Sequence, residues 1–344
     1  MNDHLAQAWV ESPLQLLGAV EAFAAGLLGP RAHIAAYRKV PTMSTTADAV
    51  ARLGLPAGLT LGLAGPAQVF RPVRGGAWAV GDVYSWPAQV RMLAEPLLEA
   101  VLLDDGLATA RAVGKLVAPG GSPLIRDHEA QPRWRRALGA AASRRLRRLA
   151  GQGRVAVFTA LPPPDGEAAA WRRQGGRLVQ HGFEWLRGTP SDTLVAQPTV
   201  ILGSALVPDG LIRDDAYYRW VADVAAHHGP AAYFPHRRED RAELAVRLPP
   251  GMQLVDVGVP VEIALRALGP DHTVFGLVST ALTTLGVVLG GTGTSIRSTP
   301  VAPEWWTARA TPRFRTMASP EGTPRLAVEK NQRDINREAG ADPA

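Results

Sequence analysis

Short apolar segments alternate with helical segments along almost the whole chain, and no other feature restricts its fold as strongly. The segments with the composition of strands are Gln7–Val10, His33–Tyr37, Leu59–Leu63, Trp78–Tyr84, Ala100–Leu103, Val155–Ala160, Arg177–Gln180, Val200–Gly203, Ala231–Pro235, Gln253–Val257 and His272–Val278. The main helical segments are Pro13–Ala25, Ala88–Glu95, Leu107–Val117, Asp214–His228, Glu239–Val246, Val261–Leu268 and Ala281–Leu289. Strands separated by helices of this length form βαβ units, so the sequence predicts an α/β fold of doubly wound, Rossmann-like domains.

A polar, turn-forming segment at Arg187–Gln197 divides this alternation into two series. A chain of 344 residues is long enough for two domains of ordinary size. We therefore predict one domain over residues 1–190, a second over 195–325, and a flexible polar tail over 330–344. If the two domains face each other, they enclose a central cleft, with ligands at the carboxyl ends of the strands.

Composition excludes several classes of protein. The chain has no cysteine, which rules out disulfide frameworks, cysteine-ligated zinc and thiol nucleophiles. Its start lacks the basic and apolar regions of a signal peptide, and the longest apolar run, at Val274–Leu289, is interrupted by hydroxyl residues and glycine. A cytoplasmic protein is therefore expected. No basic-aromatic RNA motif or helix-turn-helix pattern is present, so no nucleic-acid partner is expected.

The net charge of +6 is partly concentrated in one segment, Arg133–Ala150, which contains seven arginines. Its apolar residues recur at helical spacing and predict an amphipathic basic helix; they are Trp134, Leu138, Ala142, Leu146 and Leu149. Two interpretations stay open. The arginines of Arg133–Arg148 could touch an anionic membrane surface or a polyanionic acceptor, or the apolar stripe could simply pack on the domain while the charges are solvated.

Adjacent carboxylates and a glycine, Asp104-Asp105-Gly106, follow a predicted strand. This is the edge where ligand-facing residues collect in open α/β sheets, and a carboxylate there can accept a proton from an attacking hydroxyl. Two neighbouring side chains on an extended backbone point in different directions, so one acid is expected to be catalytic and the other structural. The alternative is an ordinary Asp-Gly turn that caps the next helix.

Polar groups also follow three predicted strands of the second series. His236 comes after Ala231–Pro235 and can donate a proton or a hydrogen bond to a phosphate, with Arg237 adding positive charge. Ser279 and Thr280 open a helix whose N-terminus suits a phosphate, and Gly203 would let a nucleotide approach the backbone. Each residue has a structural alternative: a surface histidine, a helix N-cap, and a loop exit.

The order of these segments is that of a known group of enzymes. The segments are Glu11-Ser12-Pro13-Leu14-Gln15-Leu16, Asp104-Asp105-Gly106, Ile201-Leu202-Gly203, Tyr233-Phe234-Pro235-His236, Val259-Pro260-Val261-Glu262 and Ser279-Thr280. On these motifs the chain resembles the bacterial sialyltransferases of the lipooligosaccharide sialyltransferase and polysialyltransferase families, over about residues 6 to 300. The family usually has proline after the histidine, where this chain has Arg237.

The resemblance implies a GT-B glycosyltransferase that inverts the anomeric carbon without a metal or other cofactor. Its donor would be CMP-sialic acid or a related nonulosonate, and its acceptor a glycan or glycolipid bound by the N-terminal domain. Asp104 would be the general base, with Asp105 and Gly106 shaping the loop, and Ser12 and Gln15 would belong to the same site. His236 would be the general acid or phosphate ligand.

The remaining roles implied by the resemblance belong to the nucleotide. Ser279 and Thr280 would hold the donor phosphate, Glu262 would bind the ribose hydroxyls, and Gly203 would lie under the nucleotide, with Arg237 beside the phosphate. Two alternatives stay open: an enzyme of the same fold that uses another nucleotide sugar, and a degenerate protein that only binds one.

Overall fold

The computed structural model describes residues 5–70, 76–94, 99–126, 131–191 and 195–317, and it divides at Pro190 and Ser191 into two compact units. The predicted tail at 330–344 and the end of the predicted second domain lie outside the described residues. Among the described residues, none of the helices combines the length and the apolar character that crossing a bilayer requires.

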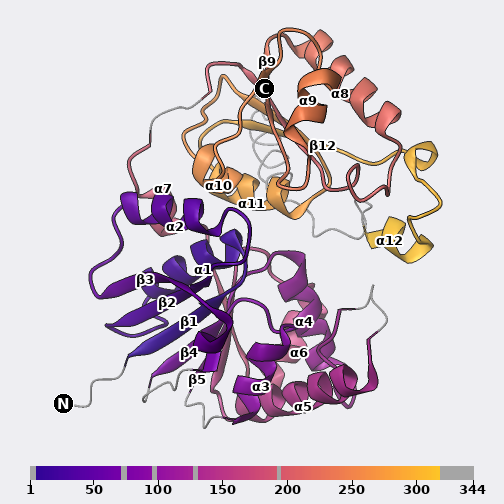
Figure 1. Ribbon diagram of the computed structural model, residues 1–344. Helices are drawn as coiled ribbons and strands as arrows, with labels where there is room; N and C mark the ends of the chain where they lie inside the picture. Colours follow the sequence, from indigo (N-terminus) through magenta and orange to yellow (C-terminus); the bar gives the residue numbers. More distant parts are fainter. Residues whose placement is uncertain (1–4, 71–75, 95–98, 127–130, 192–194, 318–344) are drawn as a thin grey trace, which may run out of the picture. The chain divides into compact units, whose positions relative to one another are not determined.

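The first unit is built on a parallel sheet of seven strands in the order β3-β2-β1-β4-β5-β6-β7 (Figure 1). The strands are β1 (Ala6–Val10), β2 (Ala32–Tyr37), β3 (Leu59–Ala64), β4 (Ala77–Val80), β5 (Glu99–Leu102), β6 (Val155–Thr159) and β7 (Arg177–Gln180). The helices are α1 (Pro13–Ala24), α2 (Met43–Arg52), the 3-10 helix η1 (Pro66–Phe70), α3 (Trp86–Ala94), α4 (Leu107–Val117), α5 (Arg133–Ala150), α6 (Asp165–Arg173) and α7 (Glu184–Arg187).

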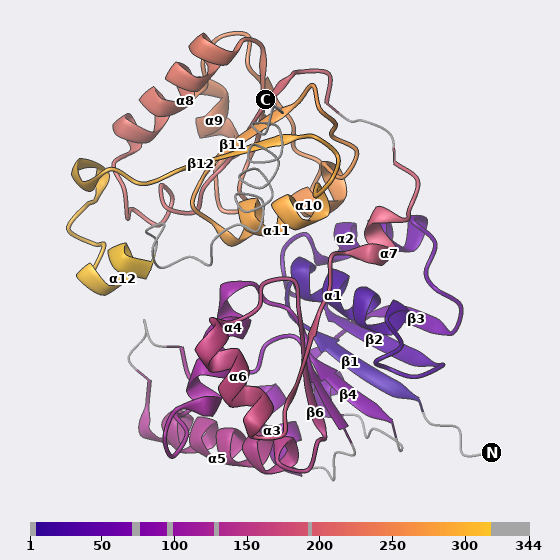
Figure 2. The same ribbon diagram turned by 180° about the vertical axis from the view of Figure 1, so that it is seen from behind.

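Helices cover both faces of this sheet, as a doubly wound fold requires. Figure 2 shows α3, α4, α5 and α6 on one face and α1, α2 and α7 on the other. The first face is packed by alternate strand residues such as Trp78, Leu102 and Val157 against Val113 of α4 and Leu146 of α5. The strand order reverses direction between β1 and β4, which makes this the topological switch point of the sheet.

The second unit is a smaller parallel sheet of five strands in the order β10-β9-β8-β11-β12. Its strands are β8 (Thr199–Leu202), β9 (Ala231–Phe234), β10 (Gln253–Leu254), β11 (Thr273–Leu277) and β12 (Ser295–Thr299). Its helices are α8 (Asp214–His228), α9 (Arg241–Arg247), α10 (Val261–Ala264), α11 (Thr280–Val288), the 3-10 helix η2 (Pro303–Trp305) and α12 (Pro312–Met317). Its switch point lies between β8 and β11.

Both faces of the second sheet are also covered. Leu265, which caps the end of α10, and Leu285 of α11 pack with Val200, Val274 and Phe234 on one face. The opposite core is formed by α8 and α9 against the intervening strand residues; its members include Tyr217, Val221, Leu244, Ile201 and Tyr233. The predicted α/β class with two doubly wound domains is therefore confirmed.

Several predicted elements differ in their bounds. The fourth strand ends at Val80 rather than Tyr84, because Gly81 and Asp82 turn the chain out of the sheet. The prolines at 162–164 predict a turn in the sequence, whereas in the structure Pro164 directly precedes a full helix, α6. The amphipathic segment 133–150 forms α5 as predicted, with Ala142, Leu146 and Leu149 buried and Trp134 exposed.

Candidate functional site

The carboxyl ends of β1, β4 and β5 are adjacent in the first sheet, and each is followed by a carboxylate. Glu11 follows β1, Asp82 follows β4 and Asp105 follows β5 shortly after its last residue. Two of these strands, β1 and β4, flank the switch point, the position where open α/β sheets bind their ligands. The parallel fold therefore gathers residues that are more than ninety positions apart in the sequence at one edge.

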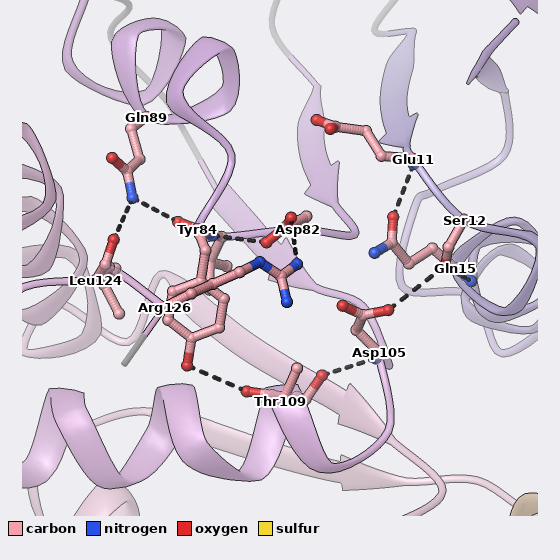
Figure 3. Close-up of polar contacts among 12 residues, drawn as sticks. Glu11, Ser12, Gln15, Asp82, Tyr84, Gln89, Asp105, Thr109, Leu124 and Arg126 are labelled. Atoms are coloured by element: carbon pink, nitrogen blue, oxygen red, sulfur yellow. Dashed lines mark hydrogen bonds and ion pairs between the residues drawn. The ribbon is translucent and has the colours of Figure 1, made fainter. Parts of the chain in front are cut away.

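Hydrogen bonds from the start of α1 organise this edge (Figure 3). The Ser12 hydroxyl accepts from the backbone N–H of Gln15 at 3.2 Å as the N-cap of α1, and it donates to Asp105 Oδ1 at 3.4 Å. The Gln15 side-chain oxygen accepts from the N–H of Glu11 at 2.7 Å. Ser12 and Gln15, both predicted site residues, thus contact the acids that line the edge.

Arg126 is the cation of this group. Its guanidinium donates to Asp82 Oδ2 at 2.8 Å, while Asp82 Oδ1 accepts from the N–H of Tyr84 at 2.8 Å (Figure 3). Asp82, Tyr84 and Asp105 line one small pocket, together with Thr109 of α4. The pocket therefore has two carboxylates, one of them neutralised by an arginine.

Burial, together with the negative charges of Asp82 and Asp104, raises the pKa of Asp105 to about 7, against the lowering effects of Gln15 and Arg126. The pKa of Glu11 is also raised, mainly by burial. A carboxylate with a pKa near neutrality is well matched to accept a proton from an attacking hydroxyl.

The neighbouring acid, Asp104, has a different environment. Its side chain is 1% exposed; Oδ1 accepts from the N–H of Gly106 and Oδ2 from that of Ala160, each at 2.7 Å. Burial raises its pKa to about 6, although these N–H groups favour the charged form. Asp104 thus ties the loop after β5 to the end of β6. Gly106 has φ of +61°, a conformation that favours glycine, and it precedes α4.

The predicted residues of the second unit follow β8, β9 and β11, which are also adjacent strands. Gly203 follows β8, His236 follows β9 and Ser279 follows β11. Glu239, in the loop after β9, accepts from the N–H of His236 at 2.6 Å and from the hydroxyl of Tyr233 at 2.7 Å. It also accepts a backbone hydrogen bond from Ser204 and so joins this loop to the one after β8. The structure therefore brings Gly203 and His236 together at the ends of β8 and β9, while Ser279 follows β11, the other neighbour of β8.

Gly203 lies against this carboxylate. A Cβ at this position would be 2.1 Å from Glu239 Oε2 and 2.5 Å from the backbone nitrogen of His236. The contact between the loops therefore requires glycine at this position, whether or not a nucleotide binds there.

His236 is half-buried, and burial lowers its pKa to about 4, with the positive charges of Arg237 and Arg238 acting in the same direction. Its Nδ1 accepts from the N–H of Arg238 at 3.2 Å, which places the proton of the neutral ring on Nε2. Arg238 is paired with Asp209 at 2.6 Å, while Arg237 is exposed. A neutral imidazole in this tautomer can donate one hydrogen bond to an anion.

Ser279 is the N-cap of α11, and its hydroxyl accepts from the N–H of Leu282 at 3.2 Å. Thr280 is the first residue of the helix. The predicted ribose ligand, Glu262, is buried at 4% exposure and accepts a hydrogen bond from the Thr284 hydroxyl. In this arrangement Glu262 joins α10 to α11 and offers little surface to a ribose.

One group among the described residues has the composition of a metal site: Glu21, His181 and Glu184, whose ligand atoms lie within 4.8 Å of one another. Both oxygens of Glu21 accept backbone N–H groups, from Trp185 at 3.0 Å and from Leu186 at 2.9 Å. Burial raises the pKa of Glu21 to about 7 and lowers that of His181 to about 4. The contacts of Glu21 are those of a side chain that fastens α7 to α1.

Sequence reasoning missed several residues of these sites, among them Asp82, Arg126, His181 and Glu239. Asp82 had a usable signal, because Gly-Asp after a short apolar strand indicates a strand end. Glu239 follows His236 closely and could have been considered with it. Arg126 and His181 reach the sites only through the tertiary fold.

The chain matches no protein-family model, and the search of curated proteins gave no match. Among solved structures it is similar to one described as "Crystal Structure Analysis of the Glycotransferase of kitacinnamycin", with 15% sequence identity and a TM-score of 0.39. The similarity covers 97% of this chain and 94% of that chain. At this distance it transfers no residue roles, and the fold and sites define the chain as a doubly wound α/β protein with two switch-point edges.

Proposed function

We propose that this protein is a glycosyltransferase that moves a sugar from a nucleotide-linked donor to a hydroxyl group of a glycan or glycolipid. The observation that carries the proposal is the position of the family-like motifs: in each unit most of them follow strands at or next to the switch point of a parallel sheet. Motif order alone would not require this. The motifs favour CMP-sialic acid or a related nonulosonate as donor, with inversion at the anomeric carbon and no metal.

Asp105 is the better candidate for the general base, in place of Asp104. The base must contact the acceptor hydroxyl, and Asp105 lines a pocket with Asp82 and Tyr84, whereas Asp104 is buried and holds two backbone N–H groups. In the proposed step the acceptor oxygen attacks the anomeric carbon and its proton passes to the Asp105 carboxylate. Asp104 would position that carboxylate by fixing the loop.

The donor phosphate would bind in the second unit. As the bond between the anomeric carbon and the phosphate oxygen breaks, its electron pair remains on CMP, and the developing charge needs stabilisation. His236 can donate from Nε2, the N-terminus of α11 at Ser279 and Thr280 carries partial positive charge, and Arg237 is exposed near His236. A bound phosphate would also favour protonation of His236, whose pKa is low in the free protein.

The test compares two variants of the full chain in a screen of CMP-sugars for donor hydrolysis, in which water replaces the acceptor. We expect Asp105→Asn to reduce turnover by about 100-fold or more while the fold survives, because general base catalysis contributes on this scale. Asp104→Asn should lower the melting temperature, and its activity loss should accompany unfolding. Equal loss of turnover in a fully folded Asp104→Asn protein would return the base role to Asp104.

Donor class is measured separately by calorimetry of the wild-type chain with CMP and with UDP. Preferential binding of CMP supports the proposed donor, and His236→Ala should weaken it. Preferential binding of UDP would assign another nucleotide sugar. Binding of CMP without hydrolysis or transfer of any CMP-sugar would indicate a degenerate protein that only binds the nucleotide.

A further inference from the structure

Helix α5 is the most basic element of the described chain. Its 18 residues include seven arginines and no aspartate or glutamate. Its inner face packs on the domain: Ala142, Leu146 and Leu149 are buried in the core of the first unit. Arg135 also points inward, where it donates to Gln89 Oε1 at 3.0 Å and to the carbonyl of Tyr84 at 2.7 Å.

The outward face of α5 carries a row of arginines. Arg133, Arg136, Arg144 and Arg148 are exposed, and within the described ranges none of them forms a hydrogen bond or an ion pair. The helix runs along the outer margin of the first unit in both views (Figures 1 and 2). Four exposed cations on one helix face give that face a positive potential, which favours contact with an anionic surface.

The residues between and beside these arginines have small or aromatic side chains. Ala137 is exposed, and at the start of the helix Trp134 is 58% exposed. Alanine lets a flat surface approach the arginine side chains closely. Tryptophan is enriched where protein meets the membrane–water interface, since its ring is amphipathic.

We propose that the outward face of α5 binds an anionic phospholipid surface, with the helix lying parallel to it and Trp134 entering the headgroup region. The row from Arg133 to Arg148 spans roughly 22 Å at 1.5 Å per residue, so all four arginines can reach one plane of headgroups. A nucleic acid fits less well, because the exposed positions offer alanine where base-reading helices have amide or hydroxyl side chains. The proposal does not depend on the proposed reaction, although it would bring the enzyme close to a glycolipid acceptor.

The test uses the full chain and sedimentation with vesicles of phosphatidylcholine, with or without about 30% phosphatidylglycerol, which gives the surface a negative potential. Wild type should sediment with the anionic vesicles only, and binding should fall as salt is added. The variant R133Q/R136Q/R144Q/R148Q should lose at least about tenfold in partition, given the contribution of each arginine near such a surface. Trp134→Phe should remove a blue shift in tryptophan emission that accompanies binding.

A control variant, R38Q/K39Q/R52Q/R297Q, removes the same charge from exposed positions outside α5 and should keep most of the binding. Loss of binding by both variants to the same extent would mean that net charge alone is responsible, and it would overturn the proposal. So would equal binding to vesicles with and without phosphatidylglycerol, or no binding by the wild-type chain. A chain that ignored vesicles but bound an anionic polysaccharide or DNA through α5 would assign the face to a different partner.

Discussion

Asp104 and Asp105 are adjacent in the sequence but have different surroundings. Asp104 has both carboxylate oxygens occupied by backbone N–H groups, while the contact of Asp105 with Ser12 is long at 3.4 Å. The first arrangement favours a fixed loop, and the second leaves an oxygen available to another molecule. This contrast is what assigns the positioning role to Asp104 and the base role to Asp105 in the proposed reaction.

The charges beside Asp105 provide a test of the base that does not depend on the size of the activity. Asp82 raises the pKa of Asp105, and Arg126 lowers it. If Asp105 is the base, donor turnover falls below about pH 7, where this carboxylate becomes protonated. Asp82→Asn should move the midpoint of that fall to lower pH, and Arg126→Gln should move it to higher pH, as measured by the pH profile of kcat/KM.

The control for these two shifts is Asp48→Asn on α2, an exposed acid outside the pocket, which should leave the midpoint unchanged. The amplitude of the activity is not the readout, since Asp82 also lines the pocket. Shifts in the same direction for Asp82→Asn and Arg126→Gln would show that the titrating group is not the one between them.

At the scale of elements, the second site is assembled by the loops that follow the strands. The loops after β8 and β9 touch through Gly203, His236 and Glu239. Glu239 is itself anchored by the hydroxyl of Tyr233, which is 2.9 Å from that of Tyr217 on α8. This buried network fixes the backbone from which His236 projects.

Gly203→Ala tests this contact between the loops. A Cβ at Gly203 would be 2.5 Å from the backbone nitrogen of His236, so the backbone must move, and we expect a loss of about 1–3 kcal/mol in the free energy of unfolding. Gly276→Ala in β11 is the matched control, because its nearest contacts begin at 3.4 Å and are ordinary ones. Denaturant unfolding of both full-length variants measures the difference; equal stability would show that the loops do not constrain Gly203.

The elements differ in how well the sequence predicts them. Leu107–Val117 and Asp214–His228 have the bounds that their apolar periodicity predicts, because each helix buries one stripe against a sheet. The prediction missed α6, since the prolines at 162–164 indicate a turn and also suit the residue before a helix. The last strand, β12, was missed too: its exposed Arg297 and Ser298 give no apolar run.

The residues of the candidate sites also differ in how well the sequence predicts them. The acidic pair and His236 could be predicted because each follows a strand, and parallel strands bring their carboxyl ends to one edge. The role of Arg126 could not be predicted, because it contacts Asp82, 44 positions away in the sequence, from a loop without regular structure. The proposed exchange of roles between Asp104 and Asp105 also depends on Ala160, which is 56 residues away.

At the scale of the whole molecule, the two units repeat one plan. Numbered within each unit, the strands follow the order 3-2-1-4-5, and the larger unit adds two further strands beyond its fifth. Each unit has its own switch point, with carboxylates at the first and with a histidine and a helix N-terminus at the second. Such a division suits a reaction with an acceptor that must lose a proton and a donor that must release an anion.

The electrostatic cost of the buried acids of the first unit should appear in the stability of the protein. Burial raises the pKa of Glu21 and Asp105 to about 7 and that of Asp104 to about 6, all above the values of exposed carboxyl groups. A carboxyl group whose pKa is raised by folding contributes most stability below its unfolded pKa, near pH 4, and that contribution is lost as pH rises through 6 and 7. The melting temperature of the first unit should therefore fall between pH 5 and pH 8.

Asp105→Asn isolates one part of this effect. The amide cannot ionise, so the variant should melt several degrees above wild type at pH 8, with a smaller gain at pH 5, where the folded carboxyl is mostly protonated. Calorimetry of the full chain at both pH values measures the gain, and Asp48→Asn should show the same change at pH 5 and pH 8. A gain for Asp105→Asn that did not grow with pH would contradict the raised pKa. A gain that grew, together with lost turnover, would show that the acid proposed as the base is retained at a cost in stability, as expected of a group kept for catalysis.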